Sequence, residues 1–373
     1  MSLREKIEHE IRERGPMPFS RYMEICLYDP AEGYYSRHVE QFGKAGDFYT
    51  SSNVHAVFGR LLAKKFNEWW CMLGQPSEIE ILELGPGRGL FARDVLDWSR
   101  KKFPEFFSAA RYTLQEASGA LQKKLCVNLR EHIESGKVEV VESSGGIAIR
   151  RTRGVTVPLI VFANEFFDAL PVEIVSAQGK LHLSCENNRL QEIWLPAANA
   201  ELEWLDRYGV HPEAGERVEV CLAAQKWMKE IAGAMERGFA VVVDYGYTRT
   251  EQLGGRHRGT LMAYRSHRAS VNPYEAPGEQ DLTAHVNFSA LAAGTEGMQG
   301  EKLTTQSQFL LAIGEANEFA DAFEDCKVPQ ERAKVMLQLK HLVTPAGMGE
   351  TFQVLVASRG VGEVLQGNRQ VIA

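Results

Sequence analysis

From residue 78 onward, short apolar runs alternate with stretches in which apolar residues recur at helical spacing. The apolar runs predict strands at 78–84, 111–116, 137–141, 158–163, 238–244 and 351–358. The helical spacing predicts helices at 89–102 and 118–133, with more near 306–342. Strands that alternate with helices are typical of βαβ units, so the sequence predicts an α/β fold with a parallel sheet.

The first 75 residues show a different pattern, in which two amphipathic helices flank an irregular stretch. Residues 2–14 and 54–73 have the helical spacing, and a glycine follows each of them. The stretch between them is rich in Gly, Tyr and Ser, and a connection of this length inside one domain is usually functional. We therefore interpret residues 1–75 as an amino-terminal helical lid.

Residues 171–237 interrupt the alternation of strands and helices. The runs VEIVSAQ, KLHLSCE and RLQEIWL have strand character and are joined by Gln-Gly and Asn-Asn pairs, which favour turns. With the helical segments that follow, they form an inserted α+β lobe between the fourth and fifth parallel strands. The core is then divided into residues 76–170 and 238–373. Because open α/β sheets bind ligands at the carboxyl ends of their strands, we expect the insertion to overhang the binding site.

Composition narrows the possible function classes. The 373 residues contain 42 Lys and Arg against 49 Asp and Glu, which gives a net charge of −7. This balance argues against broad binding to nucleic acid or to an anionic membrane, because such binding usually needs a basic surface. No apolar run approaches the ~20 residues that span a bilayer.

Cysteine usage and the amino-terminal sequence indicate the compartment. The closest two of the six cysteines, Cys185 and Cys221, are 36 positions apart, which excludes a disulfide scaffold and a zinc-ligand cluster. The first residues, MSLREKIEHEIRER, lack the apolar centre of a signal peptide and carry four Glu, whereas transit peptides are poor in acidic residues. We therefore expect a cytoplasmic protein and leave its oligomeric state open.

The strongest motif is ELGPGRG, which runs from Glu83 to Gly89, directly follows a predicted strand and begins a helix. Glycine permits positive φ and lets a ligand approach the backbone, while the helix amino terminus offers N–H groups. A tight strand-to-helix turn also needs glycine for structural reasons alone. The dinucleotide-binding fingerprint is G-x-G-x-x-G, whereas this loop reads G-x-G-x-G.

The acidic residues near this loop distinguish between ligands. Glu83 would repel a pyrophosphate but suits S-adenosylmethionine, which has a sulfonium and an ammonium group and no phosphate. Glu116 ends the second strand, where a carboxylate can accept from both ribose hydroxyls, although a solvated strand-end carboxylate is an equal alternative. Together they favour S-adenosylmethionine over NAD. The predicted cofactor-binding residues are Glu83, Gly85, Pro86, Gly87, Gly89, Glu116, Ala117 and Ser118.

A second polar group follows the fourth strand, in the sequence ANEFFDALP. This position borders the crevice of a doubly wound sheet, next to the reactive end of the cofactor. Asn164, Glu165 and Asp168 are therefore the candidate catalytic residues, although either acid could instead cap a following helix. Two carboxylates beside Phe166 and Phe167 would bind a cationic nitrogen group, because carboxylates accept guanidinium donors in pairs.

The residues before the helix at 54–73 are candidates for a cofactor cover. Gly46, Asp47 and Phe48 could fold over the cofactor, whereas Ser52 and Asn53 suit a helix cap. Capping does not explain the three earlier residues. We therefore add them to the predicted cofactor-binding residues.

A last polar cluster lies in the sequence EQDLTAHVNF. Alternation puts Asp281, Thr283, His285 and Asn287 on one face of an extended segment. The cluster could form a substrate wall, with Asp281 and His285 as substrate-binding residues. A lone histidine is more often structural, so both interpretations stay open.

The motifs GDFYTSSNVHAVFG, ELGPGRG, ANEFFDALPV, VVVDYGY and PGEQDLTAHVNF resemble, in order and spacing, those of the MidA-like methyltransferases. The resemblance covers residues 15–358 and is weakest at 178–237 and 290–345. It implies a Rossmann-like class I methyltransferase fold that binds S-adenosylmethionine. The family includes a mitochondrial complex I assembly factor that is similar to an arginine methyltransferase.

The resemblance also implies a reaction, the symmetric ω-dimethylation of an arginine on a complex I-type subunit, as in the eukaryotic members. We expect transfer of a methyl group from S-adenosylmethionine to a guanidinium nitrogen of a partner protein, without nucleic acid or a metal. One alternative is a different acceptor, either a small molecule or another protein side chain. The others are a non-catalytic assembly factor that binds the cofactor and an NAD-dependent dehydrogenase, which Glu83 and the glycine spacing disfavour.

Overall fold

The computed structural model describes residues 1–37, 56–142, 146–148, 157–187, 189–265, 268–270 and 272–361. Its largest sheet has eight strands in the order β15-β16-β10-β5-β2-β3-β4, with β14 paired to β10. Strand β16 is antiparallel to β10, β15 is antiparallel to β16, and the other strands are parallel. The strands are β2 (Ile79–Leu84), β3 (Ala110–Glu116), β4 (Val138–Glu142), β5 (Leu159–Asn164), β10 (Gly238–Tyr247), β14 (Val286–Asn287), β15 (Gln299–Thr305) and β16 (Phe352–Arg359).

This strand order creates a switch point at the carboxyl ends of β2 and β5. From β2 the chain moves outward through β3 to β4, and it then returns to β5 and β10 on the other side of β2. Such a reversal is the usual ligand site of an open α/β sheet, because the connections on its two sides diverge there. The sheet confirms the predicted α/β fold and its parallel strands.

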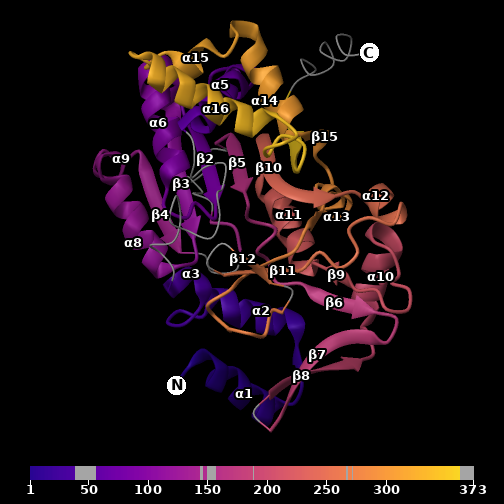
Figure 1. Ribbon diagram of the computed structural model, residues 1–373. Coiled ribbons are helices and arrows are strands. Elements are labelled where there is room, and N and C mark those ends of the chain that lie inside the picture. Colours follow the sequence, from indigo (N-terminus) through magenta and orange to yellow (C-terminus); the bar gives the residue numbers. More distant parts are fainter. Residues whose placement is uncertain are drawn as a thin grey trace.

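Helices cover both faces of this sheet (Figure 1). The central strands are buried throughout, so alternate residues enter two separate apolar layers. On one face the indole of Trp69 stacks on the ring of Phe239, with the centroids 4.6 Å apart. This face is covered by α5 (Ala56–Met72), α6 (Leu90–Lys102), α7 (Pro104–Ala109), α14 (Gln306–Gly314) and α16 (Pro329–Val343). The opposite face is covered by α11 (Leu222–Ala234) and α13 (Phe288–Ala293).

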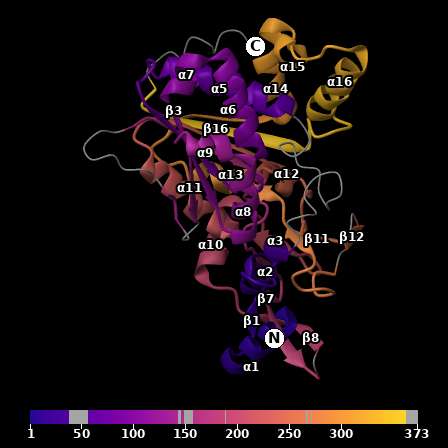
Figure 2. The same cartoon turned by 90° about the vertical axis from the view of Figure 1, so that its left-hand side faces the viewer.

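A second lobe joins the amino-terminal segment to the insertion. Strand β1 (Met17–Pro18) pairs with β7 (Gly179–Glu186), and the two segments share one apolar core. Figures 1 and 2 show this lobe at the end of the molecule opposite α15 (Ala320–Phe323) and α16. Its other elements are α1 (Leu3–Arg14), α2 (Phe19–Tyr28), α3 (Tyr34–Arg37), β6 (Glu173–Ser176), β8 (Arg189–Leu195), α10 (Asn199–Tyr208), β9 (Val218–Val220), β11 (Met262–Arg265), β12 (Arg268–Ser270) and β13 (Asp281–Thr283).

The predicted hairpins of the insertion are confirmed, and other local details differ from the prediction. Strands β6 and β7 pair next to Gly179, and β7 and β8 pair on either side of Asn187. Sequence reasoning misses β15, because its residues are polar, as suits the edge of a sheet. The helix predicted at 118–133 consists of α8 (Gly119–Asn128) and α9 (Arg130–Glu134).

Two helices pack differently from the predicted division of the chain. Helix α5, which the sequence analysis groups with the amino-terminal lid, buries Phe66 and Trp69 in the layer beside the sheet. Helix α11, which it groups with the inserted lobe, packs Met228 and Ile231 on the opposite face. Both helices therefore cover the sheet, because that is where their apolar sides are buried. Among the described residues, the amino-terminal part of the second lobe consists of α1, β1, α2 and α3.

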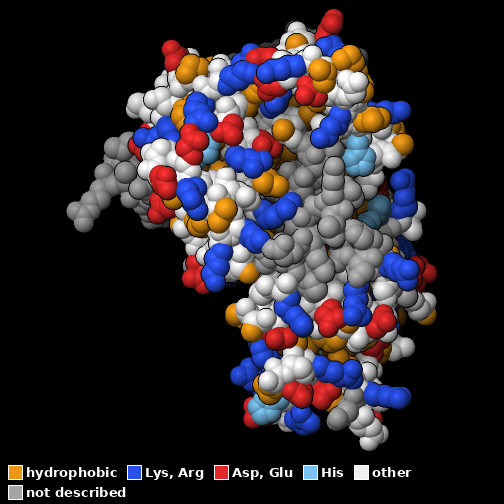
Figure 3. Space-filling view, turned by 60° about the vertical axis from the view of Figure 1, so that its left-hand side comes forward, with side chains coloured by type: hydrophobic (Ala, Val, Ile, Leu, Met, Phe, Trp, Pro, Cys, Tyr) orange, Lys and Arg blue, Asp and Glu red, His pale blue; other side chains and the backbone are white. Residues whose placement is uncertain are grey.

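The surface of the described residues carries charges of both signs. On the face in Figure 3, Lys and Arg side chains are interspersed with Asp and Glu, without a broad region of one sign among the coloured residues. In the part of the chain that the structure describes, we find no helix with the length and apolar character that a membrane crossing requires.

The stacked pair in the core gives a test of the fold. Trp69→Ala removes a side chain that is 3% exposed and leaves a cavity against Phe239, so we expect the free energy of unfolding to fall by about 3–5 kcal/mol. Leu337→Ala, at a residue that is 68% exposed, should change it by less than about 0.5 kcal/mol. Urea denaturation followed by circular dichroism measures both. Equal losses in the two variants would contradict the core position of Trp69.

Candidate active site

The glycine loop connects the carboxyl end of β2 to the start of α6. Gly85, Gly87 and Gly89 have φ of 64°, 55° and 69°, in the left-handed region that favours glycine. A Cβ on Gly89 would lie 2.7 Å from a methyl carbon of Leu129, so this glycine permits close packing below the loop. A Cβ on Gly87 would meet no atom within 4 Å, because Gly87 lines the cavity at the switch point. The loop thus forms an open cradle at Gly87.

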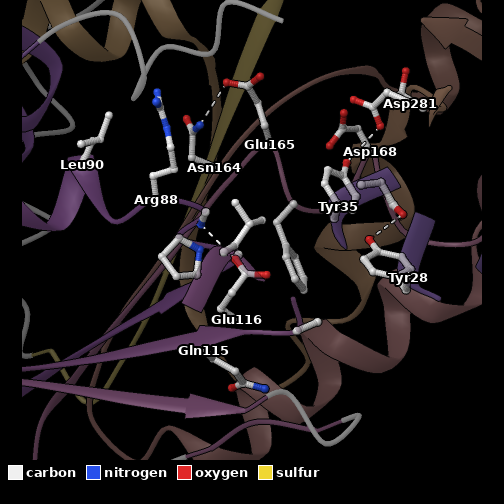
Figure 4. Close-up of a pocket in the computed structure, with 18 residues that line it drawn as sticks. Tyr28, Tyr35, Arg88, Leu90, Gln115, Glu116, Asn164, Glu165, Asp168 and Asp281 are labelled. Carbon is white, nitrogen blue, oxygen red and sulfur yellow. Dashed lines mark hydrogen bonds between the residues drawn. The ribbon is translucent and has the colours of Figure 1, made fainter. Parts of the chain in front are cut away.

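Glu116 lies beside this loop, at the carboxyl end of β3 (Figure 4). Its carboxylate accepts hydrogen bonds from the N–H groups of Gly87 (3.0 Å) and Ser118 (2.9 Å). Burial raises the pKa of Glu116 to about 7, and these donors oppose the rise. Glu116 and Ala117 line the cavity, whereas Ser118 caps α8 and is not among the lining residues. Because Glu116 is buried, it is not the solvated strand-end carboxylate of the alternative interpretation.

Glu83 does not line the cavity, although the sequence analysis places it beside the ligand. Its carboxyl group accepts a hydrogen bond from the hydroxyl of Tyr112 at 2.8 Å. Burial raises the pKa of Glu83 to about 8, and the nearby Glu116 adds to the rise. Glu83 is thus an interior residue of β2, which is buried along its whole length, and its partner Tyr112 lies on the adjacent strand β3.

The residues after β5 form a turn that carries the candidate catalytic residues. Glu165 has φ of 49°, which is strained for a residue with a side chain, and such strain clusters at functional sites. Nδ2 of Asn164 donates to Oε1 of Glu165 at 3.1 Å. The buried carboxylate of Asp244 in β10 accepts from the N–H groups of Phe167 (3.0 Å) and Asp168 (3.3 Å). An acid that sequence reasoning does not single out therefore fixes this turn.

Asp168 is the more buried of the two acids in this turn, with 5% of the residue exposed. The hydroxyl of Tyr245 donates to Oδ2 of Asp168 at 2.6 Å. Burial raises the pKa of Asp168 to about 6, and the hydrogen bond from Tyr245 opposes the rise. Oδ1 has no hydrogen-bond partner among the described residues, and Asp168 lines the cavity. Since a turn and not a helix follows β5, the helix-cap alternative for Glu165 and Asp168 is excluded.

The opposite wall of the cavity comes from the second lobe. Tyr28 of α2 and Tyr35 of α3 line it, with their ring centroids 5.5 Å apart. The hydroxyl of Tyr35 donates to Oδ1 of Asp281 at 3.1 Å, and that of Tyr28 donates to the carbonyl of Ala169 at 2.9 Å. Figure 4 shows both tyrosines gathered with Asp281 and Asp168 on one side of the cavity. Sequence reasoning misses the two tyrosines, although they lie in the stretch whose length and tyrosine content indicate a function.

The predicted extended face at 281–287 reaches the cavity only in part. Asp281 and Thr283 line it, and β13 ends at Thr283. The ring of His285 instead packs edge-on against Tyr245, with the centroids 5.2 Å apart, and its Nδ1 lies 3.1 Å from Nδ1 of His257. Burial and the neighbouring His257 lower the pKa of His285 to about 4. His285 is thus not among the lining residues, and it lies beyond the end of β13 at Thr283.

The two predicted phenylalanines separate. Phe166 lines the cavity next to the glycine loop, where a Cβ on Gly85 would lie 3.0 Å from its ring. Phe167 is buried in the apolar layer below. Three predicted cofactor-binding residues lie outside the described residues and stay a prediction: Gly46, Asp47 and Phe48.

The cavity is acidic, because its lining carries more carboxyl groups than cations. The carboxyl groups belong to Glu116, Glu165, Asp168 and Asp281, and Arg88 supplies a guanidinium. In a site with little water, such an excess attracts a cationic ligand more strongly than it would in solution. S-adenosylmethionine fits this lining, since Gly87 leaves room for a ligand and Glu116 offers a carboxylate for a ribose. The other lining residues are Tyr28, Tyr35, Gly85, Pro86, Gly87, Leu90, Gln115, Ala117, Leu121, Asn164, Phe166, Ala169 and Thr283.

Fold and site together define the class of protein. Parallel strands around a switch point, an antiparallel strand next to the last parallel one, and a glycine loop with an acid on the adjacent strand are the features of a Rossmann-like methyltransferase that uses S-adenosylmethionine. The profile of the family described as S-adenosyl-L-methionine-dependent methyltransferases matches residues 61–306, and the chain belongs to this family.

Curated relatives and solved structures agree with this family. The chain is 30% identical to the protein arginine methyltransferase NDUFAF7 homologue, mitochondrial, of Drosophila melanogaster, over 96% of this chain and 85% of that protein. It is 28% identical to the Homo sapiens protein arginine methyltransferase NDUFAF7, mitochondrial, over 92% and 80%. A methyltransferase structure from Burkholderia thailandensis, bound to S-adenosylhomocysteine, aligns with a TM-score of 0.78 and 27% identity over 96% of this chain and 92% of that one. The protein is therefore a methyltransferase, and its cofactor is S-adenosylmethionine.

The cradle at Gly87 can be tested with a matched variant. Gly87 and Gly136 both have positive φ and open space around the missing Cβ, so Gly87→Ala and Gly136→Ala impose similar backbone strain. S-adenosylhomocysteine at ~100 times its Kd should add about 2.7 kcal/mol to the stability of the wild-type protein and raise its Tm by a few degrees. We expect Gly136→Ala to keep this shift and Gly87→Ala to lose it, because only Gly87 lines the cavity.

Thermal denaturation with and without the ligand measures both variants. NAD is the control ligand, and it should not change the Tm of the wild-type protein. A full shift in Gly87→Ala, or an equal shift with NAD, would contradict the position of the cofactor.

Proposed function

We propose that this methyltransferase acts on arginine side chains of proteins and methylates a guanidinium nitrogen. The observation that carries the proposal is the set of carboxyl groups beyond the glycine loop, from Glu165, Asp168 and Asp281. Carboxylates accept the paired N–H donors of a guanidinium, and aromatic rings stack on its planar face. Relatives that match most of this chain are named protein arginine methyltransferases, which supports the same acceptor.

The acidic residues address the main chemical difficulty of this acceptor. A guanidinium nitrogen is a weak nucleophile, because its lone pair is delocalised and its pKa lies above ~12. The cofactor supplies a methyl group that its sulfonium activates. Glu165 and Asp168 orient the guanidinium and draw its positive charge to the nitrogens that do not react. A carboxylate then accepts the proton that the alkylated nitrogen releases.

Asp168 is suited to receive that proton. Asp168 is one of the residues that line the cavity, and its buried Oδ1 has no hydrogen-bond partner within the described part of the chain. Burial raises the pKa of Asp168 to about 6, which makes it a better proton acceptor than an ordinary aspartate and still leaves it mostly ionised at pH 7. Glu165 is held by Asn164 and binds the guanidinium from the other side.

We also propose that the acceptor is a subunit of the respiratory complex I type. The resemblance to the complex I assembly factor implies such an acceptor. The second lobe supports a protein acceptor, because it supplies one wall of the cavity through Tyr28, Tyr35 and Asp281. A protein that inserts an arginine between the two lobes would contact both of them.

The acceptor can be identified directly. The purified protein is incubated with S-adenosylmethionine that carries a labelled methyl group and with a lysate from cells that lack its gene, and mass spectrometry then locates the label. Label on an arginine of one protein supports the proposal. Label on a small molecule or on another side chain would establish a different acceptor. No label at demonstrated cofactor binding would contradict the proposal.

The roles of the two acids lead to a further test. Glu165→Gln and Asp168→Asn keep the size of each side chain and remove its charge, so each should lower single-turnover transfer to the identified acceptor by about ten- to hundredfold. Cofactor affinity, measured by calorimetry, should change little. Glu279→Gln is the matched control, because Glu279 is close in sequence to Asp281 but pairs with Arg265 outside the cavity lining. Wild-type transfer by Glu165→Gln would remove the main support for an arginine acceptor.

A further inference from the structure

Asp168 owes its orientation to a neighbouring strand. The hydroxyl of Tyr245, in β10, donates to Oδ2 at 2.6 Å, while Oδ1 has no partner among the described residues. A carboxylate that holds a donor on one oxygen cannot rotate freely, so its other oxygen keeps a fixed direction. Asp168 lines the cavity and Tyr245 does not.

Tyr245 is itself fixed on several sides. Its ring packs edge-on against the rings of His285 (5.2 Å) and Phe352 (5.7 Å). Its N–H donates to Oδ1 of Asp244 at 2.9 Å, and the other oxygen of Asp244 accepts from the N–H of Asp168. One buried carboxylate thus links the backbone of Tyr245 to the backbone of Asp168. The hydroxyl of Tyr245 and the carboxylate of Asp168 therefore belong to one rigid unit.

We propose that Tyr245 is a positioning residue for methyl transfer, whose hydroxyl holds one carboxylate oxygen of Asp168 so that the other faces the substrate. The inference rests on the proposed function, because it concerns the oxygen that orients the guanidinium and accepts its proton. Tyr245 acts through Asp168 and does not touch the reacting atoms. Its hydrogen bond also stabilises the ionised carboxylate, and it therefore opposes the effect of burial on the pKa of Asp168.

Other titratable groups surround Asp168, and their charges act on its carboxylate through space. Among the described side chains, Tyr245 is the one that hydrogen-bonds to its carboxylate. The groups that face Asp168 from the elements around it are Tyr28 of α2, Tyr35 of α3, Glu165 of the same turn, Asp244 of β10, Tyr264 of β11 and Asp281 of β13. His285 packs on the far side of the Tyr245 ring. Removal of the Tyr245 hydroxyl leaves all of these groups in place.

Tyr245→Phe keeps the ring and removes the donor. The loss of a hydrogen bond to a charged group should raise the pKa of Asp168 by about one to two units above its value near 6. Since the ionised form accepts the proton, transfer at pH 7 should fall by about two- to tenfold and recover as the pH rises towards 9. Tyr247→Phe is the matched control, because it removes a buried hydroxyl of the same strand that is bound to Gln252. It should leave the pH profile unchanged.

Two measurements test the proposal. The first is single-turnover methyl transfer as a function of pH, and the second is a ¹³C NMR titration of the full-length protein labelled at its aspartate carboxyl carbons. The resonance that is absent from Asp168→Asn identifies Asp168. An upward shift of both midpoints in Tyr245→Phe, and of neither in Tyr247→Phe, supports the proposal. An equal loss of transfer at every pH, with an unchanged Asp168 titration, would overturn it, because a purely structural role has that effect.

A second variant covers the case in which Tyr245→Phe does not fold. Replacement of Tyr245 by 3-fluorotyrosine makes the hydroxyl a stronger donor, so the Asp168 midpoint should move downward. An unchanged midpoint would overturn the proposal in the same way.

The two proposals fail in different ways. The NMR titration needs no acceptor. If the Asp168 midpoint rises in Tyr245→Phe but no arginine is methylated, the arginine acceptor is overturned, and with it the link from Asp168 to methyl transfer. Methylation of arginine with the same pH midpoints in the wild-type protein and Tyr245→Phe would overturn the role of Tyr245 alone.

Discussion

The site depends on a group of buried carboxyl groups, each of which needs hydrogen-bond donors in place of water. Five acids around the glycine loop and the cavity expose 6% or less of their surface: Glu83, Glu116, Asp168, Asp244 and Asp281. An ionised carboxylate in such a place costs several kcal/mol unless hydrogen-bond donors replace its water. Tyrosine hydroxyls do so in three cases: Tyr112 for Glu83, Tyr245 for Asp168 and Tyr35 for Asp281. Backbone N–H groups serve Glu116 and Asp244.

These donors also hold the parts of the site together. Tyr35 comes from the first 37 residues and Asp281 from the second half of the chain, so one hydrogen bond joins distant segments across the cavity. The carbonyl of Tyr35 accepts from Oγ of Ser118, which caps α8 beside the cofactor loop. The second lobe is thus attached to the core at the cavity itself. A ligand that fills the cavity therefore contacts both lobes at the point where they are joined.

The sequence predicts the parts of this arrangement that local pattern determines. A buried parallel strand appears in the sequence as a continuous apolar run, because both of its faces must be apolar. The loop after β2 appears as alternating glycines, because its backbone needs positive φ. Both signals lie within a few neighbouring residues. Alternation along β2 could also have placed Glu83 correctly, since it shares the face of Ile79 and Ile81, which pack towards α5 and α6.

The rest of the site depends on contacts between residues that are far apart in the chain. Nothing in the sequence around Asp244 or Tyr245 shows that they support a turn more than 70 residues earlier, because the register of β10 with β5 brings them together. Tyr28 and Tyr35 reach the cavity from an amino-terminal segment that shares one apolar core with the insertion and with β13. His285 has the alternation of a wall residue, yet β13 ends at Thr283 and the ring of His285 contacts His257 instead.

The use of uncharged donors beside the buried acids has a consequence for ligand binding. Burial raises the pKa values of Glu116 and Asp168 to about 7 and about 6, above those of the unfolded chain. Between the unfolded and folded values the folded protein binds more protons, so its stability falls as the pH rises through this range. A lysine or arginine beside each acid would remove this cost, but it would also cancel the negative charge. The donors present, a tyrosine hydroxyl for Asp168 and backbone N–H groups for Glu116, stabilise the ionised form and are themselves neutral. The negative charge is thus kept for a cationic ligand, and that ligand restores the stability when it binds.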